Sequence, residues 1–72
     1  MEIDRLVTMA NQIGDFFAAD PSREEAAKAT ALHLRRFWDP RMRAQILAHY
    51  RAQGAGLSDV TRSALALLST QP

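Results

Sequence analysis

Hydrophobic residues recur every three or four positions along four separate stretches of the chain, which is the spacing of helices that each bury one face. This spacing predicts helices over residues 3–18, 23–38, 40–53 and 58–69 of the 72 residues. We therefore expect an all-α fold, a small bundle of three main helices and a short C-terminal fourth, forming a single domain over residues 1–72. The expected core positions are Ile3, Leu6, Val7, Ala10, Ile13, Phe17, Ala27, Thr30, Ala31, Leu34, Phe37, Trp38, Met42, Ile46, Leu47, Tyr50, Leu57, Val60, Ala64, Leu67 and Leu68.

Capping residues support these boundaries. Ser22 and Glu25 have the spacing of a capping box, in which each side chain accepts a hydrogen bond from the main-chain N–H of the other residue. Asp39-Pro40 provides a cap followed by a proline at the first helical position, where its missing N–H has no cost. Ser58 is placed to cap the fourth helix, and we expect Gln71-Pro72 to fray.

The first predicted helix has a wider apolar arc than core packing requires. Met9 and Phe16, seven residues apart, lie on one flank and widen the arc to about half the circumference, whereas a surface helix needs only about 100°. The additional width predicts a second contact surface. Gly14 in the same helix predicts a close approach by a neighbouring backbone, since glycine there costs roughly 1 kcal/mol relative to alanine.

The composition excludes several classes of protein. With 47% hydrophobic and 24% charged residues, the chain is not of the disordered type, and no apolar run approaches the roughly 20 residues of a membrane span. The absence of cysteine excludes disulfides and cysteine-ligated metal or iron–sulfur sites. The N-terminus has no basic segment before an apolar one, so we do not expect export.

Residues able to carry out catalysis are few. His33 and His49 lie 16 residues apart, without the spacing of a metal site, and Ser22 and Ser58 are accounted for as helix caps. There is no glycine-rich phosphate loop, and a domain this small has little volume for a pocket of several hundred Å³. We therefore expect no catalytic, cofactor-binding or metal-binding residues, and no enzymatic activity of this chain by itself.

The charges are unevenly distributed but do not favour nucleic acid or membrane. Residues 1–34 hold three basic and six acidic side chains, and residues 35–72 hold six basic and two acidic ones. Arg41 and Arg43 fall in the first turn of a possible DNA-reading helix. However, Asp39 caps that helix with negative charge, and the net charge is only +1. The first helix lacks the basic polar face of a membrane-surface helix.

Two segments, MANQIGDFF at residues 9–17 and HLRRFWDPRMR at residues 33–43, carry a resemblance to a known family. Together with the RLV segment at residues 5–7 and Gly56-Leu57, they resemble the delta subunit of NAD-dependent formate dehydrogenase over about residues 3–68. The resemblance implies a cytoplasmic bacterial complex. Its large alpha subunit holds a molybdenum or tungsten bis-guanine-dinucleotide cofactor and iron–sulfur clusters, and its beta and gamma subunits carry FMN and further clusters toward NAD.

The resemblance also implies that the delta subunit has no redox centre and acts in assembly. We therefore expect a non-catalytic accessory subunit that assembles or stabilises the complex by docking on its large molybdenum-containing subunit. Arginines at the contact would bind carboxylates or main-chain carbonyls of the partner, with apolar side chains filling pockets around them. The expected partner-binding residues are Met9, Phe16, Leu32, Trp38, Arg41 and Arg43.

Other interpretations remain open at this point. The corner formed by Trp38, Asp39 and Pro40 is either a structural turn or part of the contact, whereas Phe37 is assigned to the core. The chain could act as a transient chaperone for cofactor insertion into the large subunit, or as a small helix–turn–helix module that binds nucleic acid. An isolated chain could also form a homodimer, because an apolar surface without its partner tends to self-associate.

Overall fold

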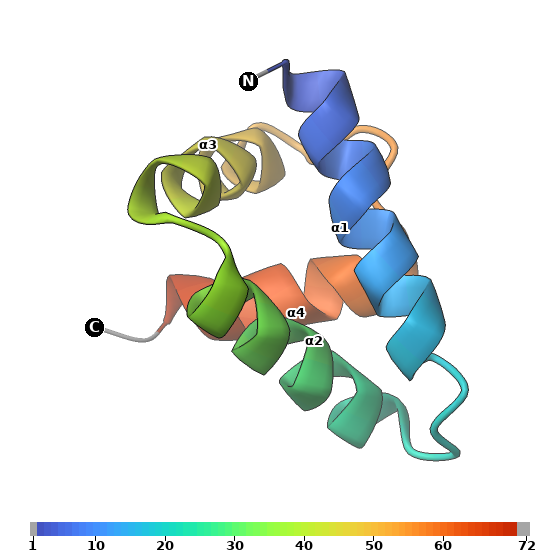
Figure 1. Ribbon diagram of the computed structural model, residues 1–72. Coiled ribbons are helices and arrows are strands. Elements are labelled where there is room, and N and C mark those ends of the chain that lie inside the picture. Colours follow the sequence, from blue (N-terminus) through green and yellow to red (C-terminus); the bar gives the residue numbers. More distant parts are fainter. Residues whose placement is uncertain (1, 71–72) are drawn as a thin grey trace.

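The computed structural model describes residues 2–70, which form four α-helices and no strand (Figure 1). The helices are α1 (Ile3–Phe17), α2 (Arg23–Phe37), α3 (Pro40–Arg51) and α4 (Asp59–Ser69). The predicted all-α fold is confirmed. Three helices begin at the predicted residue, α4 begins one residue later, and the first three end one or two residues early. The predicted fraying of Gln71-Pro72 concerns residues outside the described range.

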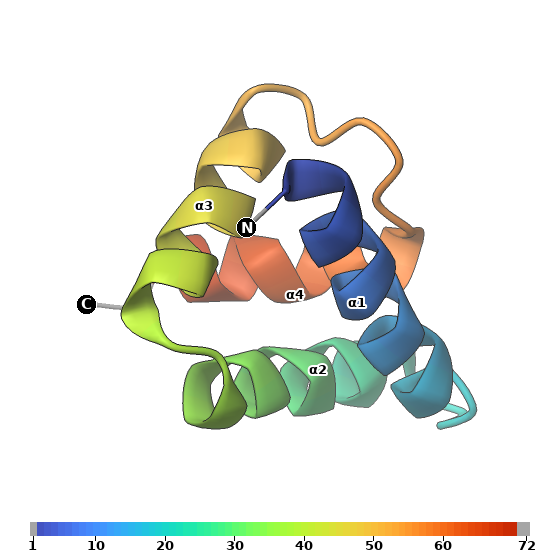
Figure 2. The same ribbon diagram turned by 45° about the horizontal axis from the view of Figure 1, so that its top comes forward.

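The longest contact between helices is that of α2 with α4, which lie side by side and run in the same direction (Figures 1 and 2). Their first turns are joined by an exposed ion pair between Arg23 and Asp59, at 3.8 Å. The α1 helix packs across both of them, and α3 packs against α1 and α4. Only Trp38 and Asp39 separate α2 from α3, so the chain turns sharply between these two helices.

The core is formed by one face of each helix. Leu6, Leu34 and Ile46, all predicted, are fully buried. The buried face of α4 differs from the predicted one. Leu65 and Thr61 are fully buried, whereas Val60 and Leu67 are only half-buried. The buried hydrophobic residues are Leu6, Ala10, Ala26, Ala27, Ala31, Leu34, Trp38, Ile46, Leu57, Ala64, Leu65 and Leu68.

The assignment of Phe37 to the core is wrong. Phe37 is the last residue of α2 and its side chain is 72% exposed, whereas Trp38 is 5% exposed. The backbone of Trp38 leaves the helix with φ −87° and ψ 137°. This change in backbone direction places the indole of Trp38 in the core. The helical period predicted a core position for Phe37 too, but that side chain is left exposed.

The corner between α2 and α3 is held by side chains that bind main-chain groups. Asp39 Oδ1 accepts a hydrogen bond from Met42 N at 2.9 Å, which confirms the predicted cap. Arg43 Nη1 donates to the carbonyl of Arg35 at 2.9 Å and also to the carbonyl of Trp38. These contacts satisfy acceptors at the end of α2 that have no partner within the helix.

The start of α2 has only half of the predicted capping box. Ser22 Oγ accepts from Glu25 N at 3.2 Å, as predicted. The reciprocal bond is absent, because Ser22 N donates to Asp20 Oδ1 at 2.8 Å and the Glu25 carboxylate faces Lys28 at 3.8 Å. Asp20, two residues before the cap, is close enough to take over the role that the pattern gave to Glu25.

Gly14 is closely approached by the first turn of α4, but the nearest atom is a side-chain hydroxyl and not the predicted backbone. A Cβ atom on Gly14 would lie 2.5 Å from Thr61 Oγ1 and 3.6 Å from Thr61 N. The Thr61 hydroxyl donates to the carbonyl of Ala10 at 3.3 Å and accepts from Ser58 Oγ at 2.8 Å. A buried threonine is thus fully hydrogen-bonded at the point where α1 and α4 approach most closely.

The loop between α3 and α4 is held by Arg62. Its guanidinium donates to the carbonyls of Leu57 at 3.2 Å, Gln53 at 3.0 Å and Gly54 at 2.7 Å. Gly54 has a φ of +64°, a region in which glycine has no steric cost. Arg62 shares this role with Asn11, whose amide donates to Gly56 O and accepts from Ser58 N, and with His49, which is bonded to Ala55 O.

Candidate functional site

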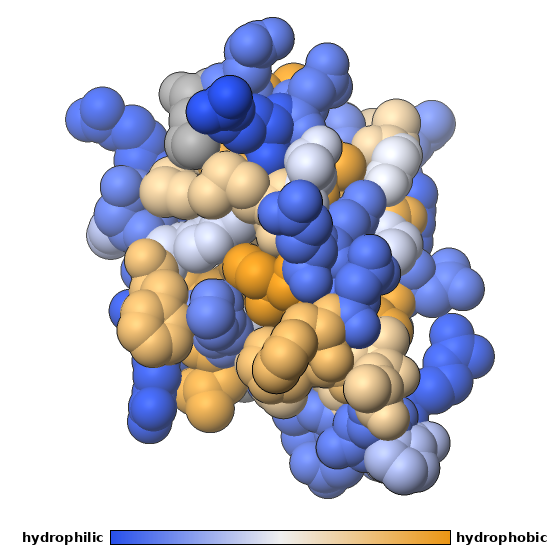
Figure 3. Space-filling model, turned by 45° about the vertical axis from the view of Figure 1, so that its right-hand side comes forward, coloured by the Kyte–Doolittle hydropathy of each residue, from blue (hydrophilic) through white to orange (hydrophobic). Residues whose placement is uncertain are grey.

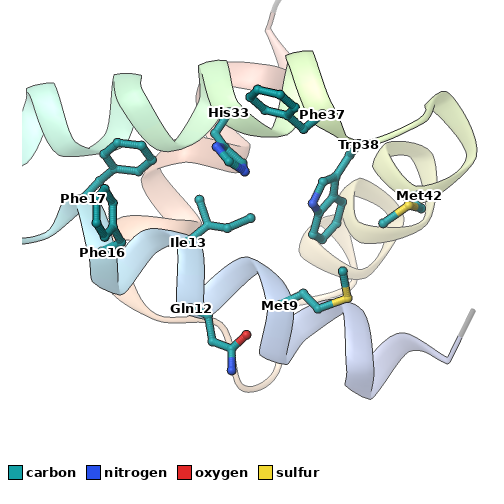
Figure 4. Close-up of a pocket in the computed structure, with 9 residues that line it drawn as sticks. All are labelled: Met9, Gln12, Ile13, Phe16, Phe17, His33, Phe37, Trp38 and Met42. Atoms are coloured by element: carbon teal, nitrogen blue, oxygen red, sulfur yellow. The ribbon is translucent and has the colours of Figure 1, made fainter.

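A hollow of about 520 Å³ lies between α1 and α2 and ends at the first turn of α3 (Figure 4). The expectation that this chain has little room for such a volume is wrong, because the hollow is a groove that lies open at the surface between the two helices. We call it the aromatic groove. Its lining residues are Met9, Gln12, Ile13, Phe16, Phe17, His33, Phe37, Trp38 and Met42.

Four rings form a continuous row along the groove. Phe16 and Phe17 meet edge to face, with ring centroids 5.1 Å apart and an interplanar angle of 83°. Phe17 lies 6.2 Å from the imidazole of His33, which in turn lies 4.7 Å from Phe37. The row crosses from α1 to α2, and its members have the spacings at which aromatic pairs attract one another.

Helical periodicity accounts for this arrangement. Met9, Ile13 and Phe16 follow one another at intervals of four and three residues, which aligns them along one flank of α1. On α2, His33 and Phe37 are four residues apart and share a face. The corner at Asp39 then brings Trp38 and Met42 to the other end of the groove, where the indole is directed toward Met9 (Figure 4).

Two of the three exposed large hydrophobic side chains in the described range lie in the groove. Phe16 is 75% exposed and Phe37 is 72% exposed. Burying a phenylalanine side chain contributes on the order of 2 kcal/mol, so the two rings leave a substantial stabilisation unrealised in the isolated chain. Figure 3 shows hydrophobic side chains gathered on one face, with strongly hydrophilic side chains around them. Such patches mark interaction sites.

The structure brings together three of the six predicted partner-binding residues. Met9, Phe16 and Trp38 all line the aromatic groove. Trp38, however, forms part of the groove wall and does not project from it toward a partner, because almost all of its surface is buried. Leu32 is 46% exposed but borders a separate hollow of about 270 Å³, together with Leu67 of α4.

The two predicted arginines have different environments. Arg41 is exposed, and its side chain has no hydrogen bond or ion pair with residues 2–70. Arg43 is half-buried and is held by the main-chain carbonyls at the end of α2. Of these two arginines, Arg41 is the one whose guanidinium group is free at the surface.

Six of the nine residues that line the groove were not predicted as site residues: Gln12, Ile13, Phe17, His33, Phe37 and Met42. Phe17 and Phe37 were assigned to the core, and His33 was treated as a lone histidine. The signal that could have found Phe37 is the Asp39-Pro40 stop two residues later, since a helix ending there leaves its last turn uncovered. Phe17 and His33 become identifiable only once α1 and α2 are placed side by side.

Three of the side chains considered as catalytic candidates make structural hydrogen bonds. His49 Nε2 is bonded to the carbonyl of Ala55 at 2.8 Å, and the Ser22 and Ser58 hydroxyls accept from the first turns of their helices. Among residues 2–70 no group of three or more His, Cys, Asp or Glu side chains could hold a metal ion. No helix in this range is long and apolar enough to cross a bilayer.

The comparison with protein families agrees with the resemblance carried by the two segments that form the groove. A family model described as the NADH-dependent formate dehydrogenase delta subunit FdsD matches residues 5–65. Comparisons with curated proteins and with solved structures found no match. The matched range includes every residue that lines the aromatic groove. The chain belongs to the family of NADH-dependent formate dehydrogenase delta subunits.

Proposed function

We propose that this delta subunit is a non-catalytic accessory subunit of a cytoplasmic bacterial formate dehydrogenase. It docks through the aromatic groove on the large molybdenum- or tungsten-containing subunit, and in doing so it assembles or stabilises the complex. The observation that carries this proposal is the pair of phenylalanines, Phe16 and Phe37, exposed in one groove of a chain whose family belongs to a multi-subunit enzyme.

The size of the chain supports a docking role. A domain of about 60 residues buries only about 60% of the surface of its unfolded chain, so its stability is marginal, and this chain has 72 residues. Two exposed phenylalanines lower its solubility without contributing to the fold. A partner that covers them would recover on the order of 2 kcal/mol for each ring.

The available side chains support a non-catalytic role. The sequence has no cysteine and so no thiolate for an iron–sulfur cluster. The recorded contacts of the His33 side chain are ring contacts with Phe17 and Phe37. A general acid or base needs a hydrogen-bonded partner that positions it, and the groove walls are mostly apolar.

The proposal is tested by purifying the tagged chain from its native host and measuring subunit stoichiometry together with molybdenum and tungsten content. We expect a large metal-containing polypeptide in a ratio near one to one. The double variant Phe16→Ala/Phe37→Ala should lose this polypeptide, whereas Leu32→Ala, which removes an exposed apolar side chain outside the groove, should retain it. Recovery of the wild-type chain without the large subunit would refute the proposal.

The same preparation distinguishes a chaperone for cofactor insertion from a permanent subunit. A chaperone would be enriched on large subunit that lacks molybdenum or tungsten and would be substoichiometric in the active enzyme. A permanent accessory subunit would be present at the same ratio in both. The engaged position of Arg43 removes one of the two arginines on which a DNA-reading role for α3 depended.

A further inference from the structure

We infer that the aromatic groove binds an acidic amphipathic helix supplied by another subunit of the complex. This inference rests on the proposed function and adds the chemistry of the segment that docks. The apolar side chains of that helix would fill the groove, and its carboxylates would pair with arginines at the rim.

Three exposed arginines lie beside the groove. Arg5 is one turn before Met9 on the flank of α1 that lines it. Arg36 is one turn after His33 on α2, and Arg41 directly precedes the groove residue Met42. These three guanidinium groups have no hydrogen bond or ion pair with residues 2–70, so each is free to bind a carboxylate.

The acidic side chains nearest the groove do not neutralise this rim. The carboxylates of Asp20 and Asp39 accept hydrogen bonds from main-chain N–H groups, at 2.8 and 2.9 Å. Asp4 and Asp15 lie on α1 about 100° around the helix from the flank that lines the groove. Glu2 is at the N-cap of α1, beyond the groove-lining residues. The rim is therefore positive above an apolar floor.

The shape of the groove selects a helix as the occupant. Residues 2–70 contain no strand, so no sheet edge is available for the addition of an extended peptide. Met9 and Phe16 are seven residues apart, which is about 10 Å or two turns along α1. A helix in such a groove uses apolar anchors at positions i, i+3 or i+4, and i+7.

Charge complementarity disfavours a second copy of this chain in the same position. Two grooves placed face to face would bring Arg5, Arg36 and Arg41 of one copy toward the same residues of the other. Like charges placed opposite each other across an interface oppose association. A partner whose apolar residues are flanked by carboxylates would be attracted to these arginines, whereas a second copy would be repelled by them.

The occupant can be identified by photo-crosslinking in the assembled complex. The probe is p-benzoylphenylalanine incorporated in place of Phe37, whose exposed ring tolerates a larger aromatic group. We expect a cross-link to a helical segment of another formate dehydrogenase subunit, with Asp or Glu within one turn of its apolar residues. A cross-link to a second copy of this chain, or to a segment without acidic residues, would overturn the inference.

The role of the rim is tested with the variant Arg36→Gln/Arg41→Gln against the matched control Arg35→Gln/Arg51→Gln, whose two arginines are exposed, lie outside the groove lining and have no side-chain partner among residues 2–70. Both variants remove two exposed positive charges, so they share the same net charge. At low salt the rim variant should bind the complex about tenfold more weakly than wild type, and the difference should shrink near 0.5 M salt, where the Debye length is only about 4 Å. The control should bind like wild type.

The two proposals fail in distinguishable ways. If the wild-type chain does not bind the complex, the proposed function fails. A different result is that the wild-type chain binds and Phe16→Ala/Phe37→Ala does not, while the rim variant and its control both bind as tightly as wild type. In that case the groove is the docking site and only the acidic helix is excluded. Equal losses in the rim variant and its control would show a non-specific effect of net charge and would also overturn the inference.

Discussion

Arg43 donates a hydrogen bond from its guanidinium group to the main-chain carbonyl of Trp38, across the corner that joins α2 to α3. The same nitrogen also reaches the carbonyl of Arg35. A side chain expected to bind carbonyls of a partner thus binds carbonyls of its own chain. The effect of removing it is consequently expected first in the fold and only then in docking.

Arg43→Ala should lower the free energy of unfolding by about 1.5–3 kcal/mol, the range for hydrogen bonds that involve a charged group. Arg41→Ala is the control, because Arg41 is exposed and its side chain has no partner among residues 2–70, and it should change stability by less than about 0.5 kcal/mol. Urea denaturation followed by circular dichroism measures both values. Equal stabilities would mean that the corner does not depend on Arg43.

Gly14→Ala should destabilise the chain even though alanine is the better helix former. The gain in helix propensity is about 1 kcal/mol. The new Cβ would lie 2.5 Å from Thr61 Oγ1 in a buried contact, and overpacking of this kind costs about 1–3 kcal/mol. A thermal melt should show a lower Tm. In the double variant Gly14→Ala/Thr61→Ala the cost of the first change should shrink, and strict additivity would exclude the steric explanation.

Arg62→Ala should open the loop between α3 and α4 while leaving the helices formed. The carbonyls of Gln53, Gly54 and Leu57 would lose the guanidinium donor, although the carbonyl of Gly54 keeps the N–H of Leu57 at 3.1 Å. Hydrogen exchange should accelerate in residues 53–58 more than in α1 or α2. Arg51→Ala, which removes an exposed arginine near the same loop, should leave the exchange unchanged.

Phe37→Ala should cost little stability, in contrast to Leu34→Ala. Leu34 is fully buried, and removal of a buried leucine side chain costs about 2–5 kcal/mol. Phe37 is 72% exposed and touches mainly His33, so its loss should cost less than about 1 kcal/mol. Denaturation midpoints of the two variants check this difference. A cost at Phe37 similar to that at Leu34 would place its ring in the core.

The fold class and helix starts were predictable because the responsible signals are local. Asp39 and Pro40 define the start of α3 whatever packs against it, and the observed cap has the predicted geometry. The error at Glu25 has a local origin too. Asp20 competes for the same N–H group, and the capping pattern does not weigh residues before the serine.

The errors in burial arise from packing between helices. The predicted core face of α4 contained Val60 and Leu67 but neither Thr61 nor Leu65. In the structure the Thr61 hydroxyl is satisfied by Ser58 and by the carbonyl of Ala10, which makes its burial inexpensive. Periodicity identifies a face of a helix but not the point at which a neighbouring helix stops covering it. For this reason Phe37 was misplaced, and Met9, Phe16 and Trp38 were foreseen in the site whereas the α2 wall formed by His33 and Phe37 was not.

The aromatic groove takes its lining from α1, α2 and α3, so an occupant would hold three helices together at once. Binding that requires the folded chain shifts the folding equilibrium, by about 2.7 kcal/mol when the partner is present at 100 times Kd. A marginal chain would then unfold far more often alone than in the complex. Because proteases act on the unfolded population, we expect unassembled copies to be degraded first, so that the supply of partner sets the cellular level of this subunit.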